Sequence, residues 1–296
     1  MKFAYRFMRP IARFPLVRNI AIKFSKLRKP VKPYISPQDP IKLQGVTESD
    51  FINNLKQTGF ASGLRIQEKQ LKEIQSFAQN NLTFANSNPK LGFYIRSKNK
   101  IESSLGLEIQ KSSYFHSRSL CNAINEISLS PLLEKIAKNY LGQAARMTST
   151  NLWWTYPANV DKETKSKNAM FFHRDVDDFG FLKFFFYLTD VTKMDGSHEY
   201  VINSLNPSLK EIISMEGSKV RRFTDEEIIR RYGKDSIINI EGLAGSGFGE
   251  DTFGFHRGTE VTRNPRLILH VMYTFFDFEI NGDHYLDMAE LEEYEF

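Results

Sequence analysis

Two short motifs in the sequence hold the residue types of a metal site. The first is His173-Arg174-Asp175, where an imidazole and a carboxylate stand two positions apart. Side chains at positions i and i+2 of a β-strand point to the same face, so both groups can reach one ion. The second motif contributes His256, which lies 83 residues downstream (256 − 173). Two histidines and one carboxylate, with coordination positions left open, suit a non-haem Fe(II) centre that activates oxygen.

The sequence around both motifs predicts strands. An apolar run of strand length, Phe181–Leu188, follows the first motif, and Arg266 opens a second such run, Leu267–Tyr273. A lone His-x-Asp arises by chance in many chains, where it is only a pair of surface or core polar residues. The distal half of the pattern favours a metal site, because His256 ends an apolar-aromatic segment and Arg266 follows it by ten residues.

The order of these features resembles the phytanoyl-CoA hydroxylase-like family of Fe(II)/2-oxoglutarate dioxygenases, over roughly residues 46–277. That family shows His-x-Asp, a strand, a Leu-Thr-Asp-Val-Thr-like segment, a turn that ends in Gly, a distal His and then an Arg. The chain also begins like the family, with a helix that leads into a Gly-Phe turn. It departs from the family's Pro-Gly-Ser-His after the turn. The matching stretches are residues 51–60, His173–Asp175, Leu188–Thr192, Asp195-Gly196, His256 and Arg266. The departing stretch is Val201–Leu205.

The resemblance implies a role for each site residue. His173, Asp175 and His256 would hold Fe(II), and 2-oxoglutarate would chelate the iron through its 1-carboxylate and keto oxygen. The far carboxylate of 2-oxoglutarate needs a bidentate donor, which Arg supplies better than Lys, so Arg266 is expected to bind it. Lys183 is expected near the co-substrate. Oxygen is the second co-substrate, and succinate and CO2 are released as a small-molecule substrate is hydroxylated.

Several alternatives stay open at this stage. Arg263 competes with Arg266, although it precedes Asn264-Pro265 and is expected in a turn. The chain could be a cupin-like jelly-roll enzyme that uses another metal without 2-oxoglutarate, or a non-catalytic binding module. Hydroxylation is expected rather than halogenation, because related halogenating enzymes carry Gly or Ala where this chain has Asp175. Nothing in the sequence identifies the substrate, which could be of lipid, sugar or another small-molecule class.

The predicted fold class is α+β. Helices are expected mainly in the first half of the chain and strands after them, with a double-stranded β-helix (a jelly-roll, cupin-like core) flanked by N-terminal helices. We divide the chain into a basic amphipathic arm with a Pro-containing linker, 1–45, and a dioxygenase domain with an acidic C-terminal end, 46–296. Residues 84–118 are expected to form a mobile flap or loop. The other predicted elements are helices at 47–58, 67–79, 131–140 and 224–232, strands at 60–64 and 147–156, and a charged insertion at 159–168.

A few further residues carry expectations of their own. One of Trp153 and Trp154 should lie in the core and the other in a groove. The histidines outside the motifs are expected at the surface (His116, His198 and His284) or, for His270, preferentially in the core.

The arm concentrates the positive charge of the chain. Residues 1–33 hold ten Lys or Arg and no acid, so the remainder carries 30 basic against 35 acidic residues, a balance of −5. Aromatic and aliphatic residues are interleaved with these cations, which favours contact with an anionic membrane surface. A structural arm and an organelle transit peptide are the alternatives. Pro10 and Pro15 interrupt the arm, so a short helix after Pro15 is expected. Nucleic acid is not expected as a partner, because the basic residues stop before the fold.

The cellular setting is inferred from what the sequence lacks. Its one cysteine, Cys121, forms no internal disulfide, which favours a reducing compartment, and we expect a cytoplasmic protein, peripheral to a membrane if the arm binds lipid. No apolar run approaches the roughly 18 residues that a membrane-spanning helix needs.

Overall fold

The computed structural model describes residues 2–25, 27, 39–158, 170–208, 212, 222–279 and 282–294. The helices in these ranges are α1 Lys2–Ala12, α2 Pro15–Ser25, α3 Glu48–Thr58, α4 Glu68–Asn80, α5 Lys98–Leu105, α6 Ser117–Leu120, α7 Asn122–Ser128, α8 Pro131–Leu141 and α11 Asp225–Tyr232, with short 3-10 turns η1 Ile95–Ser97, η2 Lys234–Ser236 and η3 Met288–Glu290. The strands are β1 Ile41–Leu43, β2 Phe60–Ile66, β3 Thr83–Ala85, β4 Gly92–Phe93, β5 Lys111–Ser113, β6 Arg146–Thr155, β7 Phe181–Tyr187, β8 His198–Val201, β9 Ile237–Ile240, β10 Ser246–Glu250, β11 His256–Gly258 and β12 Arg266–Thr274.

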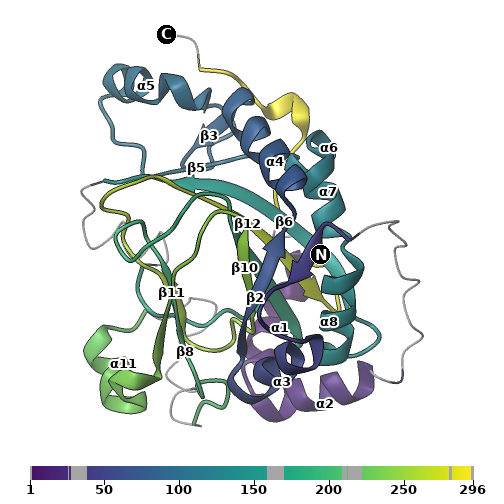
Figure 1. The fold of residues 1–296 in the computed structure, drawn as a ribbon. Coiled ribbons are helices and arrows are strands. Elements are labelled where there is room, and N and C mark those ends of the chain that lie inside the picture. Colours follow the sequence, from purple (N-terminus) through teal and green to yellow (C-terminus); the bar gives the residue numbers. More distant parts are fainter. Residues whose placement is uncertain are drawn as a thin grey trace.

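These elements form three layers (Figure 1). The large antiparallel sheet has the strand order β1-β2-β10-β7-β12-β6-β5-β3-β4, and the small sheet has the order β11-β8-β9. Helices α3, α4, α7 and α8 cover one side of the large sheet, and β8 and β11 lie on its other side (Figure 1). The predicted α+β class with a jelly-roll core and flanking helices is confirmed.

Strand β7 is the centre of the packing because both of its faces are buried. Phe184 and Phe186 belong to the core beneath the helices, whereas Phe185 and Tyr187 belong to the core between the two sheets. A strand that is covered on both faces carries mostly apolar side chains, which explains the run Phe181–Leu188, in which only Lys183 is charged. The run that begins at Arg266 is buried along its whole length for the same reason, since β12 pairs with both β7 and β6.

Local signals predicted most of the helical layer correctly. Thr47 caps α3 by accepting a hydrogen bond from the Asp50 backbone N–H, and Thr224 forms a capping box with Glu227 at the start of α11. Ser130 likewise caps α8. The predicted helix at 67–79 corresponds to α4, and the strands at 60–64 and 147–156 correspond to β2 and β6.

Two predictions about the chain path were wrong. Residues 84–118 are not a flap, because they include η1, α5, β4 and β5 and extend the large sheet beyond β6. The segment before Asp175 is not a regular strand, since His173 has only an isolated bridge to His256. The sequence of 84–118 is polar because α5 and the connecting turns are largely exposed, whereas the short strands β3 and β4 are buried.

The arm begins with a pair of helices that lies against the domain. The predicted helix after Pro15 is α2, and the residues before it also form a helix, α1, with Pro10 inside it. Apart from Asp39 and Pro40, the predicted linker lies outside the described residues, as does the charged insertion at 159–168. The division at residue 45 stays a prediction, although β1, at 41–43, pairs with β2 and so belongs to the large sheet.

Gly59 is predicted to tolerate no side chain. It ends α3 with a left-handed φ of +83°, and a Cβ at this position would clash with the buried hydroxyl of Tyr200. We expect Gly59→Ala to lower the free energy of unfolding by about 2–4 kcal/mol, from the backbone cost and the overpacking together. Urea-induced unfolding measures this loss.

Gly106 provides the matched control. It ends α5 with a similar φ of +61°, but a Cβ there meets no atom within 4 Å. Gly106→Ala should therefore cost only about 1 kcal/mol. Equal losses in the two variants would show that the contact with Tyr200 does not constrain the fold.

Candidate metal centre

The structure brings the three predicted ligands together. One potential ligand atom from each of His173, Asp175 and His256 lies within 4.8 Å of the others. The His256 Nε2 atom is 3.3 Å from Asp175 Oδ2, and the His173 Nε2 atom is 3.6 Å from Asp175 Oδ1. Both histidines are buried and Asp175 is partly buried. Residues far apart in the sequence therefore converge on a space of the size that one metal ion occupies.

Backbone hydrogen bonds hold the two histidines side by side. The His173 N–H donates to the His256 carbonyl at 3.0 Å, and the His256 N–H donates to the His173 carbonyl at 3.1 Å. Their rings are 4.2 Å apart between centroids. Arg174 points away from the site, because its guanidinium lies 3.9 Å from the ring centroid of Phe255. The alternation expected for His173 and Asp175 thus holds, even though the segment is not a regular strand.

The hydrogen bonds of the imidazoles fit a bound cation. His173 Nδ1 lies 3.0 Å from the Phe171 carbonyl, and His256 Nδ1 lies 3.0 Å from the Gly254 carbonyl. A carbonyl oxygen only accepts, so each Nδ1 carries a hydrogen, and in the neutral ring that binds a metal the lone pair of Nε2 would face Asp175. Three electron-pair donors that face one another repel unless a cation lies between them. The donor set is the one that non-haem Fe(II) sites use.

Lys183 stabilises the charge on Asp175. Its ammonium nitrogen is 2.6 Å from Asp175 Oδ2 and 2.7 Å from Asp177 Oδ2. Burial alone would raise the pKa of Asp175, but Lys183 and the two imidazoles outweigh burial and hold this pKa well below its ordinary value. Burial, together with His256, lowers the pKa of His173. Burial would also lower the pKa of His256, but Asp175 outweighs it and raises this pKa.

A pocket of about 200 Å³ opens beside the ligands, lined by both histidines, Lys111 and Arg266 among others. Among the described residues no carboxylate lines this pocket. Arg266 is buried, donates to the Gly196 carbonyl and lies 3.4 Å from the Thr155 hydroxyl. Burial, with Arg266 nearby, lowers the pKa of Lys111 to about 8. Two cations in an acid-free pocket next to a metal-ligand set form a suitable site for a small dianion.

The competing cations have different surroundings from Arg266. Arg263 lies in a turn, as expected, and pairs with the buried Asp195 at 2.7 Å, so it does not line the pocket. Lys183 contacts Asp175 and Asp177 and is also absent from the pocket lining. These contacts give no support to a role for Lys183 in binding the co-substrate, and they point instead to a role in orienting the carboxylate of Asp175.

Sequence reasoning missed two residues of the site. The sequence predicts a loop around Lys111, whereas β5 pairs Lys111 with Thr155 at the pocket. His198 was expected at the surface, but it is buried, lines the pocket and stacks on His256 with ring centroids 5.7 Å apart. Its Nε2 atom is 2.9 Å from the fully buried Glu250. No sequence spacing marks the pair of His198 and Glu250, since only the packing of β8 on β10 creates it.

The two tryptophans and His270 lie as predicted. Trp154 is in the core, where its indole N–H donates to the Tyr114 hydroxyl at 3.0 Å, and Trp153 lines the pocket. His270 is buried between Phe185 and Trp153 and does not line the pocket. It is therefore a core histidine beside the site.

Residues 201–205, where the chain departs from the family motif, form hydrogen bonds with the backbone next to His256. Asn203 has a left-handed φ of +63° in a turn. The next residue, Ser204, accepts a hydrogen bond from the Phe255 N–H at 2.8 Å, and the Val201 N–H donates to the Phe255 carbonyl at 2.8 Å. This chain thus fixes the backbone next to His256 without the Pro-Gly-Ser-His sequence.

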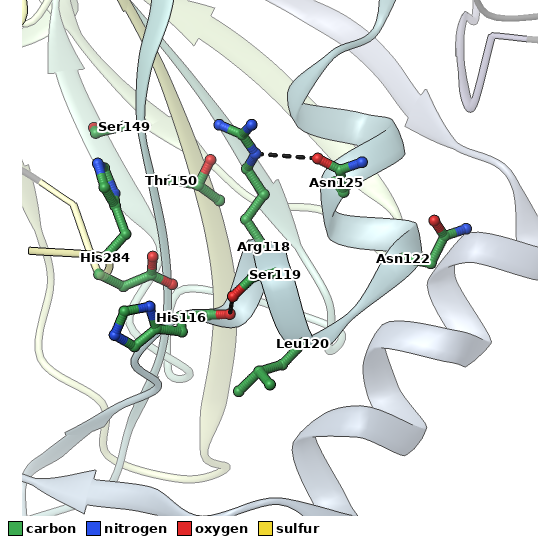
Figure 2. Close-up of a pocket in the computed structure, with 10 residues that line it drawn as sticks. His116, Arg118, Ser119, Leu120, Asn122, Asn125, Ser149, Thr150 and His284 are labelled. Carbon is green, nitrogen blue, oxygen red and sulfur yellow. Dashed lines mark hydrogen bonds between the residues drawn. The ribbon is translucent and has the colours of Figure 1, made fainter. Parts of the chain in front are cut away.

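A second cavity, of about 620 Å³, lies nearer the start of β6 (Figure 2). Ser149 and Thr150 line it, together with Arg118, whose Nε donates to Asn125 at 3.1 Å. Asp283 also lines the cavity, and its carboxylate accepts a hydrogen bond from the Ser117 N–H at 2.9 Å. None of the three metal-ligand candidates lines this cavity. We therefore place the candidate centre at the smaller pocket, where the reactive groups lie.

Comparisons with known proteins support the fold. No protein-family model and no curated protein matches the chain. Among solved structures, it is similar to HygX from Streptomyces hygroscopicus with nickel and 2-oxoglutarate bound, at 15% identity over 82% of this chain and 97% of HygX, with a TM-score of 0.52. It is also similar to the epimerase SnoN in complex with Fe3+, alpha ketoglutarate and nogalamycin RO, at 12% identity over 77% of this chain and 83% of SnoN, with a TM-score of 0.50. The chain therefore shares its fold with metal-binding, 2-oxoglutarate-binding enzymes.

Proposed function

We propose that the chain is a non-haem Fe(II)- and 2-oxoglutarate-dependent dioxygenase of the phytanoyl-CoA hydroxylase-like type. One observation carries the proposal: His173, Asp175 and His256 converge beside an acid-free pocket that contains Arg266. The likeness of the fold to proteins crystallised with metal and 2-oxoglutarate agrees with it. We assign the activity to the domain at 46–296.

Each residue then has a defined task. His173, Asp175 and His256 would hold Fe(II), which with 2-oxoglutarate and O2 supplies an oxidant for an unactivated C–H bond while the co-substrate leaves as succinate and CO2. Arg266 presents a planar fork to the far carboxylate of 2-oxoglutarate, and Lys111 adds a second positive charge in the same pocket. Lys183 keeps Asp175 ionised and oriented.

The substrate is proposed to be a small molecule of lipid or sugar type. Trp153, Met170, Phe185 and Ile268 give the pocket an apolar wall next to its cationic side. An apolar wall with a few polar groups suits a compact organic substrate, which is held by shape while the oxidant acts on one carbon.

Succinate release tests the proposed function directly. The purified chain, given Fe(II), O2 and 2-oxoglutarate, should form succinate, and omission of either the iron or the 2-oxoglutarate should stop it. A jelly-roll enzyme that works without 2-oxoglutarate, or a binding module, would form none. The assay measures uncoupled turnover, in which 2-oxoglutarate is consumed in the absence of the substrate.

The first site prediction concerns the metal ligands. His173→Ala and His256→Ala should each abolish Fe(II) binding and succinate formation, because each removes one of three ligands. His284→Ala, a change outside the triad, should leave both unchanged. Metal content after dialysis and the far-ultraviolet circular dichroism spectrum measure binding and fold. Full activity in either ligand variant would refute the assignment.

The second site prediction concerns the co-substrate. Arg266→Lys should raise the 2-oxoglutarate concentration for half-maximal turnover by about 10- to 100-fold, because an ammonium group cannot reproduce the bidentate fork. Arg263→Lys is the matched control and should have no such effect, since Arg263 pairs with Asp195 in a turn. If Arg263→Lys raised the 2-oxoglutarate requirement and Arg266→Lys did not, Arg263 would be the residue that binds the far carboxylate.

The third site prediction concerns the reaction outcome. Asp175 supplies a carboxylate to the ligand set, so no position is vacated for a halide, and its negative charge disfavours a second anion nearby. We expect the product to be hydroxylated and to carry label from 18O-enriched oxygen gas. A chlorinated product from the unaltered chain in chloride buffer would contradict this expectation.

A further inference from the structure

Helices α1 and α2 form a hairpin whose inner side is fixed to the domain. The guanidinium of Arg18 is buried and lies 3.1 Å from Asp251, which also accepts from the Tyr140 hydroxyl at 3.0 Å. The same guanidinium lies 4.0 Å from the ring centroid of Phe253. A buried ion pair that also stacks on an aromatic ring holds the hairpin in one place.

Apolar packing adds to this attachment. Met8 and Ala12, one turn apart on α1, are buried in a cluster with Val176, Phe181 and Phe253. Val176 directly follows Asp175, so the hairpin packs on the segment that leaves the candidate metal centre. Its position relative to that centre is therefore set by the fold.

The outer side of the hairpin is apolar and exposed. Of the fifteen large hydrophobic side chains that are exposed in the described part of the chain, eight lie between residues 3 and 27. Phe3, Phe7 and Ile11 follow one another at intervals of four on α1, and Leu16, Ile20 and Phe24 do so on α2, so each helix presents one stripe. Phe14 and Leu27 complete the set. An exposed apolar surface of this extent marks a site of association.

The charges that the two helices themselves carry have one sign, and the acids nearby belong to the C-terminal segment, where Asp277 and Glu279 flank Phe278, whose ring lies 5.7 Å from that of Tyr5. Arg6 and Lys23 are exposed, Arg9 and Arg13 are partly exposed, and no acidic residue occurs between residues 1 and 33. A second copy of the hairpin would place like charges opposite one another with no acid in the arm to neutralise them, which disfavours self-association through this surface. Exposed aromatic and aliphatic side chains among cations are instead the composition of helices that lie in the interface of an anionic bilayer.

We propose that the outer side of the α1–α2 hairpin docks the protein on the surface of an anionic lipid bilayer. The apolar stripes enter the boundary between headgroups and acyl chains, and the Arg and Lys side chains contact the acidic headgroups. Each helix has 11 residues, too short to cross a bilayer, and no helix in the described ranges is long and apolar enough to do so. The attachment is therefore peripheral, and it is independent of the proposed catalytic activity.

Binding to vesicles tests the proposal. The full chain should co-sediment with vesicles of equal parts phosphatidylcholine and phosphatidylserine more strongly than with pure phosphatidylcholine, and added salt should weaken the difference. Arg6→Gln with Lys23→Gln should reduce the affinity about 30-fold, since each cation near an anionic surface contributes roughly fivefold. Phe7→Ser with Phe24→Ser should reduce it about tenfold or more.

Matched controls lie elsewhere on the surface. Lys42→Gln with Lys56→Gln removes two other exposed cations, and Leu243→Ser with Met288→Ser removes two other exposed apolar side chains. Both control pairs should bind vesicles like the unaltered chain. Absence of binding by the unaltered chain, or equal binding by hairpin and control variants, would overturn the proposal. So would a dimer in sedimentation equilibrium that the hairpin variants convert to a monomer, because the surface would then serve a second copy.

Discussion

The pair of backbone hydrogen bonds between His173 and His256 is the interaction on which the candidate centre depends. These bonds, of 3.0 and 3.1 Å, connect two segments that belong to no common run of sequence, and they place the two imidazoles 4.2 Å apart. Each ring is then turned by its own Nδ1 contact with the carbonyl two residues earlier. Because these backbone contacts position both rings with their Nε2 atoms towards Asp175, the backbone contributes to preorganising the site for an ion.

The electrostatics of the site divide into two regions. On one side Lys183 pairs with both Asp175 and Asp177, so one of their two negative charges is compensated within the protein. On the other side Arg266 and Lys111 line a pocket without any carboxylate among the described residues, so their charge is available to a ligand. A metal-ligand set at the boundary of these regions would place a bound cation next to a bound dianion. The fold produces this separation because β7 carries Lys183, whereas β12 and β5 carry the two pocket cations.

The sequence predicts the features that depend on neighbouring residues and misses those that depend on contacts between distant segments. Caps such as Thr47 and Thr224, the apolar run of β7 and the alternation of His173 with Asp175 depend on neighbouring residues, so the sequence predicts them correctly. The triad itself is long-range, and the resemblance to a family supplied what spacing alone could not. Lys111 and the contact of His198 with Glu250 depend on which strands lie side by side, and no residue pattern within either segment marks them. The order β12-β6-β5 that brings Lys111 next to Arg266 is a property of the assembled sheet.

The central claim is that one pocket binds a metal and 2-oxoglutarate in contact with each other. Calorimetric titration of 2-oxoglutarate under anaerobic conditions, with and without Fe(II), measures this coupling before any oxygen reacts. Chelation of Fe(II) by 2-oxoglutarate would add bonds that neither ligand makes alone, and the coupling is reciprocal, so Fe(II) should increase the affinity for 2-oxoglutarate by at least about tenfold. The increase should disappear in the variant that combines His173→Ala with His256→Ala. An affinity that is the same with and without Fe(II), or no binding of 2-oxoglutarate under either condition, would contradict the account.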